Sequence, residues 1–215
     1  MNEECKADKL LALSAAVLAG GDSKRMGKNK AFLELGGERL IDLIVSRLGK
    51  LFAEVFVVTN DPGKFSYLPV RLEKDIYKQG EKNSLRGIHT ALKKASYFSC
   101  FVTACDMPFI SLSLIKYMSD YTKEYDLVTP KLDGYYQPMF SFYNKKILPV
   151  IDEALMKRKY KITSLFKELK TKEILADIVS LYDPKQLSFI NINSPEIFRW
   201  AEAYIQENDW IKDKL

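Results

Sequence analysis

The sequence is poor in the residues on which several common chemistries depend. It has 3 cysteines (Cys5, Cys100 and Cys105) and a single histidine, His89. The cysteines form no C-x-x-C pair, which argues against a disulfide framework and against a zinc knuckle. A lone histidine without a partner that the sequence reveals gives no support to triad chemistry. We expect Cys105 to be an inert core thiol of a strand and His89 to be structural or solvent-facing.

Long apolar runs and strong charge are also missing. No apolar stretch approaches the roughly 20 residues of a membrane span, and residues 10–13 are too short for the core of a signal peptide. The net charge of +5 is spread along the chain, which mildly favours anionic ligands and does not argue for nucleic acid. We expect a cytoplasmic protein with no membrane or nucleic-acid partner. Its 215 residues predict one domain (1–215) with enough chain for a substantial core.

Two common phosphate-binding motifs are absent. The Walker A pattern G-x-x-x-x-G-K-[ST] fails because Gly21 and Gly27 are one residue too far apart and Asn29 follows Lys28. The dinucleotide fingerprint G-x-G-x-x-G does not occur either. The chain is therefore predicted to be neither a P-loop NTPase nor a carrier of the Rossmann fingerprint.

A different glycine-rich loop is present. The apolar run 15–19 ends at Gly20 and Gly21, and a basic segment that contains Arg25 follows and ends at Lys30. Glycine lets a backbone approach a ligand closely, and the amides of such a loop form a concavity that suits anions. Arg25 and Lys30 supply positive charge for a triphosphate. A plain surface turn is the alternative, but a turn has no need of this cluster of cations.

Apolar runs alternate with amphipathic segments along the chain. This alternation predicts a three-layer αβα fold of the α/β class with a mostly parallel central sheet and right-handed crossovers. We expect strands at 15–19, 55–59, 98–104, 126–129, 136–143 and 188–192. We expect helices at 40–48, 85–95, 112–118 after Ser111 as N-cap, 147–155, a short one capped by Thr163, and 195–206 after Ser194 as N-cap.

Polar residues follow the predicted strands. The glycine loop follows the first, Asn60 the second and Asp106 the third, so all three are expected at one edge of the sheet, where ligands bind. Asp106 could hold Mg²⁺ against a triphosphate, because Mg²⁺ takes carboxylate and phosphate oxygens. Asn60 and Asp75 could touch nucleotide or metal, or could be ordinary turn residues. Asn193 could complete a metal shell or cap the last helix.

The segment Tyr135–Phe140 is rich in aromatic residues. It could offer a flat stacking surface for a ring system. The alternative is that these aromatic side chains pack against neighbouring strands.

Several motifs together resemble those of the molybdenum cofactor guanylyltransferases, within the nucleotidyltransferase superfamily. The resemblance covers residues 12–203 and implies a Rossmann-like nucleotidyltransferase fold. The matching residues are Leu18-Ala19-Gly20-Gly21-x-Ser23-x-Arg25-Met26-Gly27-x-x-Lys30, Val58-Thr59-Asn60, Lys74-Asp75, Arg86-Gly87-Ile88-His89-Thr90-Ala91-Leu92, Ala104-Cys105-Asp106-Met107-Pro108-Phe109-Ile110, Gln137-Pro138-Met139-Phe140 and Asn191-Ile192-Asn193-Ser194-Pro195-Glu196.

The resemblance implies GTP and molybdopterin as substrates and Mg²⁺ as cofactor. GMP would pass from GTP to the terminal phosphate of molybdopterin with release of pyrophosphate, and other proteins of cofactor biosynthesis are further candidate partners. Arg25, Lys30 and Asp106 would be catalytic, and Asp106 would hold the metal. The implied nucleotide contacts are Leu18, Ala19, Gly20, Gly21, Lys30, Asn60, Asp75 and Asp106.

The sequence departs from the family pattern at one place. Asn83 and Ser84 replace the usual Gly-Pro before the "GGI" stretch, and Arg86 replaces its first glycine. This departure leaves the recognition of the base open. Related cytidylyltransferases and sugar-phosphate nucleotidyltransferases share the loop, although many of them carry alanine where this chain has Gly20. A catalytically silent nucleotide-binding subunit is the alternative from another class.

Overall fold

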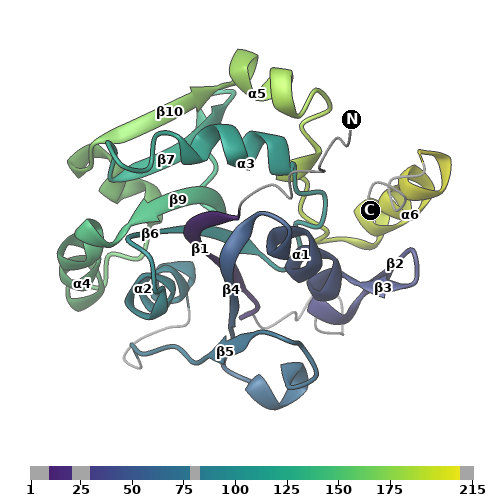
Figure 1. The fold of residues 1–215 in the computed structure, drawn as a ribbon, viewed down its shortest axis with the longest axis horizontal. Coiled ribbons are helices and arrows are strands. Elements are labelled where there is room, and N and C mark those ends of the chain that lie inside the picture. Colours follow the sequence, from purple (N-terminus) through teal and green to yellow (C-terminus); the bar gives the residue numbers. More distant parts are fainter. Residues whose placement is uncertain (1–9, 21–29, 78–82, 209–215) are drawn as a thin grey trace, which may run out of the picture.

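A mostly parallel β-sheet forms the middle of the protein in the computed structural model, which describes residues 10–20, 30–77 and 83–208 (Figure 1). In the described part of the chain seven strands follow the order β10-β7-β9-β6-β1-β4-β5, and an eighth strand, β8, pairs with β7. β1 pairs in parallel with β4 and β6, whereas β9 runs antiparallel to both of its neighbours. The strands are β1 (Leu11–Leu18), β4 (Phe52–Val58), β5 (Arg71–Glu73), β6 (Ser99–Ala104), β7 (Leu127–Leu132), β8 (Tyr135–Tyr136), β9 (Phe140–Asn144) and β10 (Thr171–Leu175).

Helices cover both faces of this sheet. Buried side chains of α1, α3 and α5 belong to one hydrophobic core, and those of α2 and α4 belong to a second core on the opposite face. The predicted three-layer αβα architecture is thereby confirmed. The α-helices are α1 (Leu40–Gly49), α2 (Ser84–Lys94), α3 (Leu112–Ser119), α4 (Leu148–Met156), α5 (Ala176–Tyr182) and α6 (Pro195–Glu207).

Strand β1 explains why the sheet is buried on both faces. Its alternate side chains point to opposite faces, so Ala15 and Val17 enter the first core while Ala16 and Leu18 enter the second. None of the four is more than 9% exposed. A continuous apolar run is therefore the correct pattern for this central parallel strand.

Smaller elements complete the described structure. A third hydrophobic cluster packs α6 against the β2–β3 hairpin and the start of α1. No helix of the described residues has the length and hydropathy needed to cross a membrane. The hairpin strands are β2 (Glu34–Leu35) and β3 (Glu38–Arg39), and the 3₁₀ helices are η1 (Lys30–Phe32), η2 (Pro62–Phe65), η3 (Lys145–Ile147), η4 (Ile162–Glu168) and η5 (Leu187–Phe189).

Two of the predicted helix caps are confirmed. The Ser111 side chain accepts a hydrogen bond from the Leu114 amide at 3.2 Å at the start of α3. The Ser194 side chain accepts one from the Ile197 amide at 3.4 Å at the start of α6. The predicted cap at Thr163 is wrong, because Thr163 lies inside η4.

The predicted strand at 188–192 is also wrong. Residues 187–189 form η5, and the Ile192 amide donates to the Asp106 carbonyl rather than to a neighbouring strand. Of the apolar residues that suggested a strand, Ile190 and Ile192 pack in the cluster with α6, and Phe189 packs against the first core.

The predicted strand at 136–143 is interrupted. Pro138 has no amide hydrogen to donate, and a turn closes where the Phe140 amide donates to the Gln137 carbonyl at 2.9 Å. The segment therefore forms two strands, β8 and β9, in place of one.

Candidate functional site

A pocket opens at the carboxyl ends of the central parallel strands. Its volume of about 570 Å³ is within the range of small-molecule sites. Residues that follow β1, β4 and β6 contribute to it, as the sequence predicts for an open α/β sheet. The lining residues are Leu18, Ala19, Gly20, Lys30, Val58, Thr59, Asn60, Asp75, Asn83, Ser84, Gly87, Ala104, Cys105, Asp106, Met139 and Asn191.

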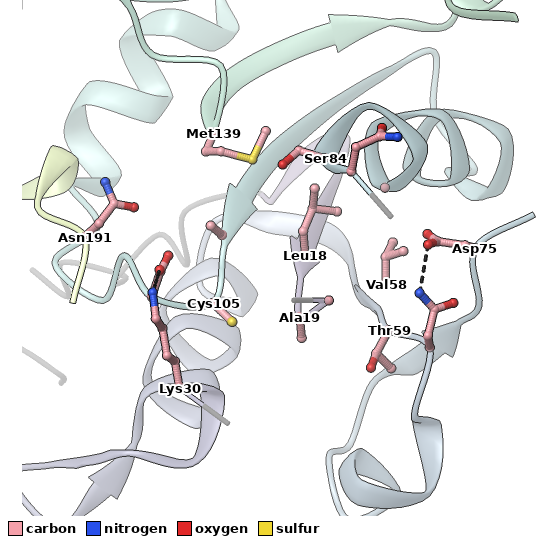
Figure 2. A pocket seen from close by; sticks show the side chains of 16 residues that line it. Leu18, Ala19, Lys30, Val58, Thr59, Asp75, Ser84, Cys105, Met139 and Asn191 are labelled. Carbon is pink, nitrogen blue, oxygen red and sulfur yellow. Dashed lines mark hydrogen bonds and ion pairs between the residues drawn. The ribbon is translucent and has the colours of Figure 1, made fainter. Parts of the chain in front are cut away.

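Backbone hydrogen bonds hold the strand ends together beyond the regular sheet. The Ala19 amide donates to the Val58 carbonyl at 2.9 Å, and the Cys105 amide donates to the Leu18 carbonyl at 3.1 Å. The chain segments that leave β1, β4 and β6 therefore start side by side. Figure 2 shows Leu18 and Ala19 in the middle of the pocket, with Lys30 on one side and Asp75 on the other.

Lys30 and Asp106 form the charged end of the pocket. The Lys30 Nζ lies 3.1 Å from the Asp106 Oδ2, and the two side chains are 22% and 18% exposed. Lys30 begins η1, and Asp106 follows β6 in a turn in which the Met107 amide donates to the Ala104 carbonyl. An ammonium group and a carboxylate thus meet where both remain open to a ligand.

Asn60 and Asp75 form the opposite end. The Asn60 side-chain amide donates to the Asp75 Oδ2 at 2.8 Å. Asp75 comes two residues after β5, which pairs in parallel with β4. Asp75 is therefore a fourth residue at a strand end, a placement that the sequence analysis missed because β5 has only three residues.

The structure brings most of the predicted site residues to one pocket. Leu18, Ala19, Gly20, Lys30, Asn60, Asp75 and Asp106 all line it. A Cβ atom built on Gly20 would meet no atom of the described residues within 4 Å, so this part of the structure leaves the space beside the glycine open. Gly21 and Arg25 lie outside the described residues, and their roles remain predictions from the motif.

The donor groups of the pocket suit a metal that is shared with a ligand. In the described ranges no three His, Cys, Asp or Glu side chains gather into a metal-binding group. Asp106 offers one carboxylate, and Mg²⁺ commonly takes one or two carboxylates together with phosphate oxygens and water. The residues present therefore fit Mg²⁺ bound jointly by Asp106 and a polyphosphate.

Two predicted placements need correction. Cys105 is not a strand residue, because it lies in the turn after β6 and lines the pocket. Burial and the adjacent Asp106 carboxylate raise the pKa of its thiol to about 12, so the expectation of an inert thiol stands. Asn191, not Asn193, lines the pocket, and Ser194 caps the last helix.

His89 is structural, and it has a partner that the sequence did not reveal. It is buried in α2, and its Nε2 lies 2.8 Å from Asp152 Oδ1 of α4. This pair ties two helices of the same layer together, outside the pocket lining.

The aromatic segment contributes little to the pocket. The Tyr136 ring packs edge-on against Phe166 at 5.0 Å between centroids, and Tyr135 is exposed. From this segment only Met139 is among the lining residues. Packing therefore explains Tyr136 better than ligand stacking does.

Comparison with known proteins places this chain among the nucleotidyltransferases. The model of the MobA-like NTP transferase domain matches residues 15–173. A protein of Natranaerobius thermophilus named probable molybdenum cofactor guanylyltransferase is 36% identical over 201 residues, which are 92% of this chain and 98% of that protein. The Desulfosudis oleivorans protein named molybdenum cofactor guanylyltransferase is 30% identical and covers 91% of this chain, which in turn spans 96% of that protein.

Solved structures agree in fold. Molybdopterin-guanine dinucleotide biosynthesis protein A of Archaeoglobus fulgidus superposes with a TM-score of 0.79 at 26% identity, covering 90% of this chain and 99% of that one. The 4-diphosphocytidyl-2C-methyl-D-erythritol synthase of Anaerococcus prevotii superposes with a TM-score of 0.63 at 17% identity, covering 90% and 97%. The second likeness concerns the fold alone.

Proposed function

Since this chain belongs to the MobA-like NTP transferase family and is a nucleotidyltransferase, we propose that it transfers GMP from GTP to the terminal phosphate of molybdopterin. Pyrophosphate is the second product. Relatives named for guanylyl transfer in molybdenum cofactor formation support this reaction. The proposed donor GTP is a cytoplasmic nucleotide, which is consistent with the predicted location.

The observation that carries the proposal is the meeting of Lys30 and Asp106 at the carboxyl edge of the sheet, 3.1 Å apart. A triphosphate needs cations and a shared metal, and this end of the pocket offers one ammonium group and one hard oxygen ligand. The glycine loop begins at the same edge, after β1. In the proposed complex the phosphates lie at this end, with Gly21 and Arg25 contributing from the loop.

The nucleoside then lies toward Asn60 and Asp75. Asp75 lies on the far side of Leu18 and Ala19 from Lys30 (Figure 2), and the Asn60 side chain donates a hydrogen bond to it. Amide and carboxylate groups suit hydrogen bonds with ribose hydroxyls and base N–H groups. The open space beside Gly20 leaves room for the nucleotide between the two ends.

The proposed chemistry requires alignment more than proton transfer. A phosphate oxygen of the acceptor is already ionised, so it can attack the α-phosphorus of GTP without a general base. A new P–O bond forms, the bond between the α-phosphorus and the pyrophosphate oxygen breaks, and pyrophosphate leaves with the electron pair. Lys30 orients the phosphates and neutralises charge that develops on the leaving group. Mg²⁺ held by Asp106, when bound, acts as a template and Lewis acid.

The direct test is pyrophosphate release from GTP in the presence of Mg²⁺ and molybdopterin. Asp106→Asn is expected to lower kcat by about 10² or more, the size typical of lost electrostatic stabilisation. Asp120→Asn, at the exposed C-cap of α3, is the matched control and should leave the rate unchanged. Full activity of Asp106→Asn would refute the metal assignment, and turnover of CTP in preference to GTP would favour the cytidylyl alternative.

A further inference from the structure

A buried arginine stands behind the nucleoside end of the pocket. Arg86 lies in the first turn of α2 and is only 6% exposed. A cation is disfavoured at a helix N-terminus, where the helix dipole is positive. A buried charge also needs an opposite charge to offset its lost hydration. This place in the fold therefore requires a specific anionic neighbour for Arg86.

Among the described residues, Asp75 is an anionic neighbour of Arg86. Arg86 Nη2 lies 3.7 Å from Asp75 Oδ2, and the two side chains are 7% and 10% exposed. The same oxygen of Asp75 accepts the 2.8 Å hydrogen bond from Asn60. Asn60 and Asp75 line the pocket, whereas Arg86 is not among the lining residues. Arg86 thus contacts a pocket residue from behind.

The segment that carries Asp75 is fixed to the same helix by its backbone. The Ile76 amide donates to the Thr90 Oγ1 at 3.0 Å. The Tyr77 ring lies edge-on to the His89 ring, with 6.3 Å between centroids. These contacts position the backbone of residues 75–77 against α2. The ion pair with Arg86 is a contact that α2 makes with the Asp75 carboxylate.

We propose that Arg86 is a positioning residue for nucleotide selection. It balances the charge of the Asp75 carboxylate and fixes its direction, so that this carboxylate accepts a hydrogen bond from a donor group of the nucleoside. The donor is either the 2-amino group of guanine or the 2′-hydroxyl of the ribose. This inference depends on the proposed function, because that proposal puts the nucleoside at this end of the pocket.

The test is the binding of GTP with Mg²⁺, measured by calorimetry, together with steady-state kinetics. Arg86→Met is expected to raise the Kd and KM for GTP about tenfold, as for loss of a charge-assisted contact. The kcat at saturating GTP should stay near the wild-type value, because Arg86 is remote from the Lys30–Asp106 end. Arg86→Lys, which keeps the charge, should restore part of the affinity.

Two further experiments distinguish a positioning role of Arg86 from a general contribution to stability. The double variant Arg86→Met/Asp75→Asn should bind GTP no more weakly than Asp75→Asn alone, because Arg86 acts through Asp75. ITP lacks the guanine 2-amino group and 2′-deoxy-GTP lacks a ribose hydroxyl. The penalty of Arg86→Met should vanish for the analogue that lacks the donor facing Asp75. Lys93→Met is the matched control, since Lys93 is a half-exposed cation of α2 that pairs with Asp152.

The outcomes that overturn the proposal are distinct from failure of the proposed function. If wild-type protein binds GTP and Arg86→Met binds it within about twofold, against the roughly tenfold expected for a lost charged contact, Arg86 is structural only. Equal penalties for GTP and both analogues also overturn it. If Arg86→Met does not fold, Arg86→Gln takes its place and the same criteria hold. Absence of GTP binding by the wild type would instead refute the proposed function.

Discussion

Lys30 Nζ and Asp106 Oδ2 lie 3.1 Å apart although 76 positions separate the two residues in the sequence. The pair forms because η1 follows the loop after β1 while Asp106 follows β6, the neighbouring parallel strand. Both side chains are about one-fifth exposed. A single ion pair that solvent still reaches contributes little to stability, on the order of 1 kcal/mol, so its position in the pocket is better explained by ligand binding.

Replacing Lys30 should therefore affect turnover more than folding. We expect Lys30→Met to lower kcat/KM for GTP by about 10² or more, because charge on the phosphates loses its partner. The free energy of unfolding should change by less than about 1 kcal/mol. Urea unfolding and pyrophosphate release measure the two effects. A stability loss of several kcal/mol with unchanged turnover would show that the pair is structural.

Nucleotide binding should stabilise the protein selectively. A ligand that binds only the folded state adds about 2.7 kcal/mol at one hundred times its Kd. We expect GTP with Mg²⁺ to raise the Tm more than CTP, ATP or UTP do. Chelation of the metal should reduce the GTP shift, because Asp106 and the phosphates then repel each other. A larger shift with CTP would contradict the proposed base.

Two glycines of the pocket should respond differently to alanine. A Cβ on Gly87 would come 2.9 Å from Leu18 Cδ1, whereas one on Gly20 would meet no atom within 4 Å in the part of the chain that the structure describes. Gly87→Ala must displace Leu18 and should cost about 1–3 kcal/mol of stability, as overpacking does. Gly20→Ala should leave the fold unchanged and weaken the binding of GTP, since the alanine methyl group occupies the space proposed for the nucleotide. Thermal unfolding with and without GTP distinguishes them, and equal Tm losses would refute this difference.

The pH dependence of the unfolding free energy should reveal the ionisation of the Glu173 carboxyl group. Tyr136 and Lys131 donate hydrogen bonds to this carboxylate and lower its pKa. Because the folded pKa lies below the unfolded one, the stabilisation is present above the unfolded pKa and is lost as pH falls through the folded pKa. The difference in unfolding free energy between wild type and Glu173→Gln should be largest above about pH 5 and shrink below about pH 4. A difference that is constant with pH would contradict this.

Cys105 should be unreactive in the folded protein despite its place in the pocket. Its pKa of about 12 keeps the thiol protonated at neutral pH, and the thiolate is the nucleophile. At pH 8 we expect iodoacetamide to label Cys105 at least about a hundredfold more slowly than in urea, where its pKa returns to about 8.5. Peptide mapping by mass spectrometry measures both rates. Comparable rates would place the thiol in a more polar environment.

The sequence by itself determined the central strands, most of the helices and one edge of the site. Apolar runs at β1, β4 and β6 specify strands buried on both faces, and the polar residues after them must then lie at one edge. The helix caps at Ser111 and Ser194 could also be predicted from the sequence, because a capping side chain bonds to an amide only three residues away.

Only the tertiary structure decided the nucleoside end of the pocket. The edge strands β5 and β10 carry few buried side chains. Their sequences therefore contain no apolar run from which a strand could be predicted. The contacts of Asp75 with Asn60 and Arg86 join the segments that follow β5 and β4 with helix α2. Local periodicity reports which face of a segment is buried, but pairing between distant segments depends on how the layers pack.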